Sequence, residues 1–124
     1  SVCTIDDDGQ PYAFSAFYAF DELNFCLLLA SCDESSHVKF LKNSKLVAGT
    51  VALDTKIVGK IEGVQFQGVM SEASESDREI YFKRFFYAKA MDPKIWSISL
   101  EKVKFTSNTL GFGKKIKWER GDKI

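Results

Sequence analysis

The sequence predicts a mainly β fold, a small antiparallel barrel of six strands into which two helices are inserted. Three observations point to this class: apolar and polar residues alternate in several short runs, tight-turn residues separate most of these runs, and only two segments have helical spacing. A parallel α/β fold would instead alternate its strands with long helices. A barrel this small has little free internal volume, so we expect a ligand on its outside or between subunits.

The first half of the chain contains three strand-like runs and one short helix. Val2 to Ile5 and Tyr12 to Phe20 flank Asp8-Gly9, a pair that supplies the positive φ of a hairpin turn. Phe25 to Ala30 is apolar at every position, which indicates a central strand covered on both faces. Capping serines followed by helical spacing then predict a short helix over residues 35–43.

The second half alternates strands and one longer helix. Lys45 to Leu53 is strand-like, and an extended segment follows from Ile57 to Met70, whose glycines indicate bulges or a close approach by another backbone. A capping box that begins at Ser76 opens a predicted helix up to residue 90. Ile95 to Phe105 alternates again and precedes a basic tail.

Length, charge and cysteine content exclude several classes of function. The 124 residues suffice for one domain, and 17 basic residues balance 17 acidic ones, so no global field favours nucleic acid or an anionic membrane. The longest apolar run is far too short to span a bilayer. Three cysteines without C-x-x-C spacing and a single histidine predict neither a disulfide framework nor a metal centre. We therefore expect a cytoplasmic protein.

The junction after the central strand is the first candidate site. Ser31, Ser35, Ser36, His37 and Lys39 follow a buried strand at the predicted start of a helix. Free amide groups and the helix dipole favour an anion there, and Ser35, Ser36, His37 and Lys39 can donate to phosphate oxygens. In the alternative interpretation a serine only caps the helix, while the histidine and lysine point to water.

The basic tail and the glycine-marked strand supply a second candidate. The tail residues that can stack on a planar ring or neutralise a phosphate are Phe112, Lys114, Lys115, Lys117, Trp118 and Arg120. Single-stranded nucleic acid uses the same chemistry, but the zero net charge argues against it, and a solvated edge strand is the alternative. Gln65 and Gln67 share one strand face and can reach the heteroatoms of a flat ligand, although a solvated sheet face would alternate in the same way.

Five segments together resemble a known family over nearly the whole chain. They are residues 16–21 (AFYAFD), 47–51 (VAGTV), 61–68 (IEGVQFQG), 103–106 (VKFT) and 108–115 (NTLGFGKK) with Trp118. This combination is similar to the pyridoxamine 5'-phosphate oxidase-related, FMN-binding split-barrel family, and in particular to its YhbP-like (UPF0306) branch. The block at 108–115 is the most specific of the five.

The resemblance implies a six-stranded antiparallel Greek-key split barrel that forms a homodimer with flavin mononucleotide (FMN) between the subunits. It implies an oxidoreductase whose small-molecule substrate the sequence does not identify. Relatives carry an extra N-terminal segment, so we expect residues 1–124 to be one domain that lacks a short leading piece.

The resemblance also assigns residues to the cofactor. By position, Ser35, Ser36 and His37 stand where the family has a Ser-Arg-Lys phosphate motif, and Ala13 stands near a basic residue of the family's vitamin oxidases. Both departures remove phosphate contacts, which Lys39, Lys114 and Lys115 would replace in part. The remaining implied contacts are Phe17, Tyr18 and Ala19 beside the flavin ring, Ser31 near the ribityl chain, and Gln65 or Gln67 from the partner subunit. Trp118 of the basic tail stays a candidate for stacking on the ring.

Two other functions stay open at this point. A dimeric split barrel can lose flavin and bind another ligand or act as a structural module. Some split barrels instead bind or degrade haem, for which His37 would be the single available histidine ligand.

Overall fold

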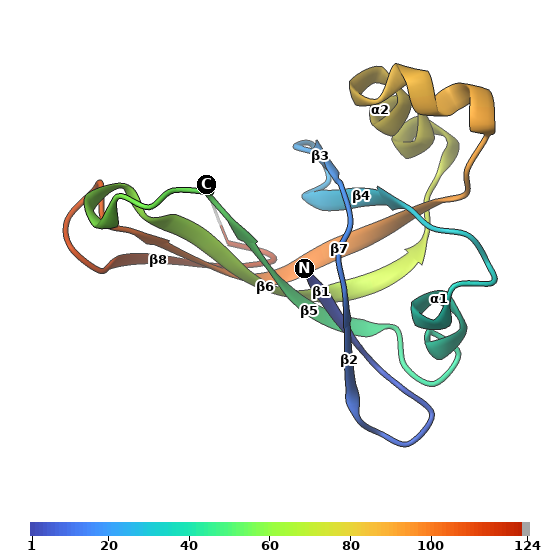
Figure 1. Ribbon diagram of the computed structural model, residues 1–124, viewed down its shortest axis with the longest axis horizontal. Coiled ribbons are helices and arrows are strands. Elements are labelled where there is room, and N and C mark those ends of the chain that lie inside the picture. The colour runs from blue at the N-terminus through green and yellow to red at the C-terminus, as the bar shows by residue number, and fades with distance from the viewer. Residues whose placement is uncertain (123–124) are drawn as a thin grey trace.

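The computed structural model describes residues 1–122 as one antiparallel sheet with helices packed on its flanks (Figure 1). The strands are β1 (Val2–Ile5), β2 (Pro11–Phe14), β3 (Ala19–Asp21), β4 (Cys26–Ala30), β5 (Leu46–Ala52), β6 (Glu62–Glu72), β7 (Ile95–Ser107) and β8 (Lys114–Glu119). The helices are α1 (Ser36–Phe40), α2 (Glu75–Arg84) and the 3-10 turns η1 (Val58–Lys60) and η2 (Phe86–Met91). Within this range no helix is long and apolar enough to cross a membrane.

The sheet divides along its longest strand, β7. Its strand order is β2-β1-β5-β6-β7-β4-β3, and β8 is a further neighbour of β7. β6 follows β7 from end to end, whereas on the other side β4 pairs with Ile95 to Ser99 and β8 pairs with Lys102 to Ser107. The result is an open barrel half around β1 to β4 and a protruding arm, which we define as β8, η1 and the facing halves of β6 and β7 (Figure 1).

A bulge and a glycine mark the point of division. The β6–β7 register shifts between Gln67 and Gly68, opposite Glu101. A Cβ atom on Gly68 would lie 2.5 Å from the backbone oxygen of Ser99, so this position requires glycine. The expectation of bulges or close contacts along this segment is confirmed at Gly68. Gly59 lies in η1, outside the strand, with open space around it.

β4 separates two hydrophobic clusters, as its apolar sequence predicts. Leu27 and Leu29 belong to the larger cluster inside the barrel half, and Leu28 belongs to the smaller cluster beneath α2. The larger cluster comprises Val2, Leu27, Leu29, Leu41, Val47, Phe66, Met70, Ile98 and Leu100. The smaller comprises Ala19, Cys26, Leu28, Tyr81, Phe82 and Ile95. The predicted central strand, covered on both faces, is confirmed.

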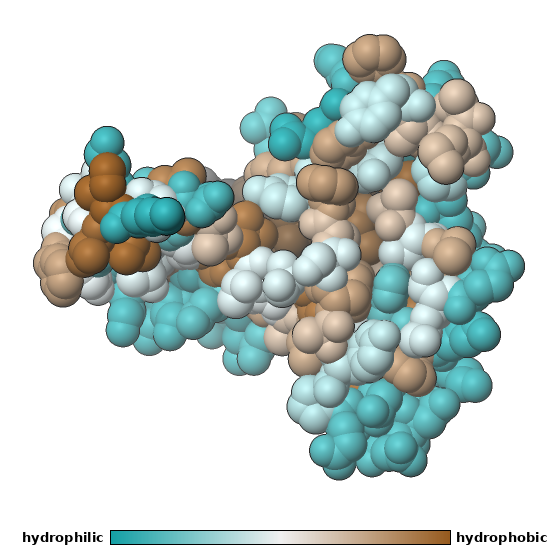
Figure 2. Space-filling model, viewed as in Figure 1, coloured by the Kyte–Doolittle hydropathy of each residue, from teal (hydrophilic) through white to brown (hydrophobic). Residues whose placement is uncertain are grey.

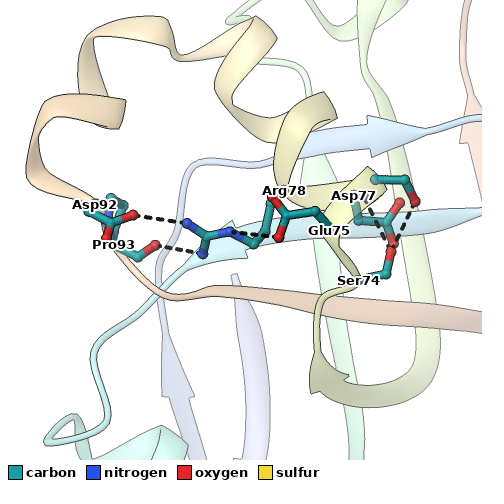
Figure 3. Close-up of polar contacts among 7 residues, drawn as sticks. Ser74, Glu75, Asp77, Arg78, Asp92 and Pro93 are labelled. Carbon is teal, nitrogen blue, oxygen red and sulfur yellow. Dashed lines mark hydrogen bonds and ion pairs between the residues drawn. The ribbon is translucent and has the colours of Figure 1, made fainter.

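α2 begins two residues earlier than the sequence predicts. Ser74, and not Ser76, is its N-cap, and the Ser74 hydroxyl accepts a hydrogen bond from the backbone N–H of Asp77 at 3.3 Å. Arg78 then donates to Asp92 and to the carbonyl of Pro93, which ties α2 to the chain beyond η2 (Figure 3). The predicted single helix is therefore an α-helix followed by a 3-10 turn.

The structure has eight strands where the sequence predicts six. Residues 15–18 leave the sheet, so the run from Tyr12 to Phe20 becomes β2 and β3. The basic tail adds β8, because it pairs with the distal half of β7. The segment from Ile57 begins with η1 and enters the sheet only at Glu62.

Replacing Gly68 with alanine tests the close packing at the division of the sheet. The new methyl group would meet the Ser99 carbonyl, so we expect Gly68→Ala to lower the free energy of unfolding by about 1 to 3 kcal/mol in urea denaturation. Gly59→Ala is the matched control because nothing lies within 4 Å of its added Cβ atom. Equal stability of the two variants would contradict this role for Gly68.

Candidate ligand-binding site

An apolar hollow of about 370 Å³ opens between the arm and the β3–β4 hairpin. We call it the Trp118 hollow; it is lined by Tyr18, Phe20, Phe25, Leu27, Val51, Val64, Phe66, Leu100, Val103 and Trp118. The Trp118 and Phe25 rings lie 5.1 Å apart at an interplanar angle of 31°. Figure 2 shows apolar residues in the recess between the arm and the barrel half. Such a surface suits a flat, largely apolar ligand.

One polar atom of a residue that lines this hollow has no partner. The Nε1 atom of Trp118 is covered and makes no hydrogen bond with any part of the chain that the structure describes. Buried indole N–H groups normally find an acceptor, because an unpaired buried donor costs about 1 to 3 kcal/mol. The covered N–H is therefore a donor for which the described part of the chain supplies no acceptor, and it becomes available to a ligand only if the atoms that cover it move.

The second group of candidate residues lies around α1. The Ser31 hydroxyl and the Nε2 atom of His37 are 2.8 Å apart, and the His37 ring stacks on Phe14 with centroids 3.7 Å apart. Burial lowers the pKa of His37, so its imidazole is neutral at neutral pH. The Trp96 indole donates to the Ser31 carbonyl at 3.1 Å. His37 is thus part of a packed cluster and does not point to water.

Ser35 occupies the N-cap position of α1, but its side chain does not cap the helix. Its hydroxyl lies 3.2 Å from the sulfur of Cys32, and no capping hydrogen bond forms. α1 has only five residues, so its dipole is short, and an anion here would depend on side chains. Ser36 and Lys39 are exposed and free to turn toward a ligand.

Phe17, Tyr18 and Ala19, which the family resemblance places beside a flavin ring, have different environments. Tyr18 lines the Trp118 hollow, whereas the Phe17 side chain is 80% exposed. Ala19 is buried against the cluster beneath α2, so only its backbone is available to a ligand.

The two glutamines lie on the face of the sheet opposite Trp118. Gln65 pairs with Lys104, which pairs in turn with Lys117, and Gln67 pairs with Lys102. These side chains border a second hollow of about 300 Å³, to which Lys102, Lys104 and Lys117 bring positive charge. Trp118 also borders this second hollow, although its side chain alternates onto the opposite face of the sheet from the glutamines.

The family-specific block at 108–115 builds the turn at the tip of the arm. The Asn108 side chain accepts from the Gly113 N–H at 2.8 Å and donates to the Val58 carbonyl at 2.8 Å. The Ser107 hydroxyl donates to Glu62 at 2.8 Å. Lys114 and Lys115 follow this turn and are exposed. The sequence signal in this block thus has a structural cause.

The tip of the arm exposes many large apolar side chains (Figure 2). They are Leu53, Ile57, Val58, Ile61, Leu110, Phe112 and Ile116. Contiguous exposed apolar surface of this kind marks an interaction site.

The residues around α1 and the Trp118 hollow are far apart. Figure 1 shows α1 and β8 at opposite ends of the molecule. Within one chain, the predicted site residues therefore form two groups, one at each end.

Sequence reasoning missed a buried group formed by Asp21, Cys26 and Asp77. Their ligating atoms all lie within 4.8 Å of one another. Asp77 enters the sequence interpretation only as part of a capping box, and its position beside Asp21 arises from the packing of α2 on β3. No local pattern could have indicated this contact. The three cysteines are free thiols.

Solved structures of other proteins share this fold. A mycobacterial haem-binding protein from Mycobacterium smegmatis superposes with a TM-score of 0.77 at 16% identity, over 95% of this chain and 51% of that one. A FAD-binding protein from Mesorhizobium loti superposes with a TM-score of 0.68 at 15% identity, over 84% and 81% of the two chains. The chain thus has an antiparallel, split-barrel-like fold in which the barrel is not closed.

Sequence comparison identifies the family. The chain is 42% identical over 120 residues to UPF0306 protein YhbP of Salmonella schwarzengrund (strain CVM19633), across 94% of this chain and 82% of that protein. YhbP of Salmonella newport (strain SL254) is 41% identical over the same length. No family model matches the sequence. The chain belongs to the UPF0306 (YhbP) family.

The lowered pKa of His37 predicts a pH dependence of stability. Because the folded state resists protonation of this imidazole, its stabilising contribution is present above about pH 6.5 and is lost as the pH falls toward the lower folded-state pKa. We expect wild type to lose more free energy of unfolding than His37→Gln between about pH 7.5 and 5. Parallel pH profiles of the two proteins in chemical denaturation would contradict this.

Proposed function

We propose that this chain is an FMN-binding flavoprotein of the pyridoxamine 5'-phosphate oxidase-related type, an oxidoreductase for a small molecule that works as a homodimer. The observation that carries the proposal is the aromatic Trp118 hollow with its unpartnered indole N–H. The flavin ring is flat, has an apolar edge, and carries oxygen and nitrogen acceptors on the opposite edge. That combination fits the hollow, since the apolar lining receives the ring and the indole donates to an acceptor.

The chain's own residues would orient the ring and exclude water from it. Phe25 and Trp118 form one wall of the hollow, and Tyr18 and Phe20 lie at its exposed rim. The flavin, when bound, supplies the redox chemistry, and the protein supplies position and electrostatics.

The phosphate would lie near α1. Ser31, Ser35 and His37 present two hydroxyls and an imidazole there, and Lys39 is exposed beside them. A phosphate dianion would favour protonation of His37, which converts the imidazole into a double donor. Each charge-assisted hydrogen bond is worth about 1.5 to 3 kcal/mol, so the absence of the family's arginine weakens this subsite.

Two chains are required to complete the site. Because α1 lies at the opposite end of the molecule from β8 and contributes no residue to the Trp118 hollow, we infer that one ligand meets both where the arm of one chain lies beside the α1 junction of another. The apolar tip of the arm supports this arrangement, because a partner would cover it. Such a site also gives the glutamines of a partner subunit a route to the ligand.

A haem is a poorer fit to the same hollow. The only histidine of the chain is His37, which lies with Ser31 and Phe14 and is not among the residues that line the hollow. An apolar pocket without an imidazole offers haem no axial histidine.

The direct test is the absorption spectrum of the purified protein, followed by titration of the colourless form with FMN. We expect a flavin spectrum, or micromolar or tighter binding of added FMN. A protein that stays colourless after FMN is added would contradict the proposal and favour a structural module. A Soret band would contradict it in favour of haem.

Two substitutions test the two ends of the site. Trp118→Phe removes the unpartnered donor, and Lys39→Glu reverses a charge beside the phosphate subsite, so we expect each to weaken FMN binding at least tenfold, about 1.4 kcal/mol. Lys42→Glu is the matched control, since Lys42 is exposed just beyond α1. Unchanged affinity in both variants, with thermal stability preserved, would place the ligand elsewhere.

The oligomeric state tests the shared site. Phe112 is 83% exposed at the tip of the arm, so we expect Phe112→Asp to shift the protein from dimer to monomer in light scattering and to weaken FMN binding. Leu23→Asp is the control because Leu23 is 86% exposed in the β3–β4 turn and is not one of the apolar residues at the tip of the arm. A monomeric wild type that binds FMN would contradict the shared site.

A further inference from the structure

Two buried carboxyl groups face each other where α2 packs on the β3–β4 hairpin. Asp21, the last residue of β3, is 2% exposed, and Asp77, in the first turn of α2, is 7% exposed. Cys26, at the start of β4, is 8% exposed and completes the group, whose oxygen and sulfur atoms lie within 4.8 Å of one another. Figure 3 shows Asp77 beside the N-cap Ser74.

The two carboxyl groups have different environments. Asp21 accepts hydrogen bonds from the backbone N–H groups of Leu23 and Asn24 at 3.1 and 3.2 Å and from the Asn24 side chain at 2.9 Å. Burial alone would raise the pKa of Asp21, but hydrogen bonds from Asp77 and Asn24 lower it below its usual value. The Oδ1 atom of Asp77 is enclosed without a partner. Asp21 is therefore held as the carboxylate.

No cation in the part of the chain that the structure describes forms an ion pair with either carboxylate. Arg78 of α2 is bound to Glu75 and Asp92. Arg120, which follows β8, donates to the carbonyls of Leu100, Asn24 and Phe25, and its charge acts on the Cys26 thiol. Two ionised carboxylates at this separation would repel each other strongly.

We propose that Asp21 and Asp77 share one proton, and that the resulting hydrogen bond is a pH-dependent latch between α2 and the β3–β4 hairpin. The Asp77 carboxyl O–H donates to the Asp21 carboxylate. The shared proton neutralises one of the two buried charges and gives the Asp77 carboxyl a hydrogen-bond partner. Besides this bond, α2 is held by Tyr81 and Phe82 in the cluster beneath it. Lowering the pH would stabilise the packing of α2 on the β3–β4 hairpin, and raising the pH would destabilise it.

The direction of the effect follows from the titration of Asp77. Burial first, then the hydrogen bond to Asp21 and its charge, raise the pKa of Asp77 from 3.8 to about 6. A group whose pKa is raised on folding stabilises the fold below its unfolded-state pKa, and this contribution is lost as the pH rises through the folded-state value. The facing titratable groups are Asp21 on β3 and Cys26 on β4, whose thiol pKa burial raises.

A divalent cation held by the two carboxylates and the thiol is the competing interpretation. The proton is favoured because both Asp21 oxygens already accept hydrogen bonds and because the Cys26 thiol is stabilised in its neutral form. Metal ligation would require the thiolate.

The decisive comparison uses wild type, Asp77→Asn and the control Glu75→Gln. Glu75 lies in the same helical turn, with its side chain 85% exposed. Between about pH 4.5 and 7.5, we expect the folded-to-unfolded ratio of wild type to fall about 25-fold relative to Asp77→Asn. Glu75→Gln should follow wild type. Hydrogen exchange of residues 75–84, corrected for intrinsic rates, should accelerate over the same range in wild type and Glu75→Gln but not in Asp77→Asn. Parallel profiles for wild type and Asp77→Asn would overturn the proposal.

Two further measurements test the proposal even if a variant folds poorly. The infrared spectrum of wild type near pH 5 should contain a protonated carboxyl band that titrates with an apparent pKa near 6, and its absence would overturn the shared proton. Zn²⁺ is the probe for the cation. Stabilisation of wild type by micromolar Zn²⁺ that is lost in Cys26→Ser would also overturn the proposal and assign the group to a metal.

Discussion

The architecture depends on a change of partner along one edge of β7. Up to Ser99 this edge pairs with β4, and from Lys102 onward it pairs with β8, while β6 continues along the other edge. Arg120 joins the two partners, because its side chain donates to the carbonyl of Leu100 in β7 and to that of Phe25 just before β4. This division opens the barrel, projects the arm, and leaves the Trp118 hollow between them.

The same division explains why the candidate site is in two parts. β8 extends away from the barrel half that carries α1, so the indole and the serine-histidine cluster cannot meet within one chain (Figure 1). In the dimer that we propose, the arm of each chain lies near the barrel half of the other, which would bring the two parts together. The apolar tip, which would otherwise remain exposed, then has a partner. The open barrel, the exposed apolar tip and the proposed two-chain cofactor site are thus all explained by the change of partner along β7.

Local sequence was sufficient for much of the fold. The apolar run of β4, the Asp8-Gly9 turn with Gly9 at φ 75°, and the close approach at Gly68 were all predictable, because each depends on neighbouring residues or on one backbone requirement. The predicted start of α2 was wrong because Ser74 and Ser76 are both competent caps, and the Asp77 N–H bonds to the hydroxyl of Ser74. Local alternation likewise gave no reason to break the run at residues 15–18.

The candidate site was less predictable because it depends on register and on contacts distant in sequence. The tail residues and the glutamines have suitable chemistry, but only the pairing of β6, β7 and β8 shows that Gln65 and Trp118 occupy opposite faces. His37 was identified from its position after the central strand, whereas its stacking on Phe14 is a tertiary contact. The contact between Asp21 and Asp77 is also a tertiary contact that no local pattern predicts.

The most direct test of a site shared by two chains is subunit complementation. One preparation carries Lys39→Glu and the other carries Trp118→Phe, and the two are unfolded together, refolded as a mixture, and titrated with FMN. Random pairing of a two-fold dimer gives about one quarter of the wild-type number of tight sites, because half of the dimers contain one intact site of two. Recovery of that fraction is the predicted result. A mixture that binds no more FMN than the separate variants would contradict the account.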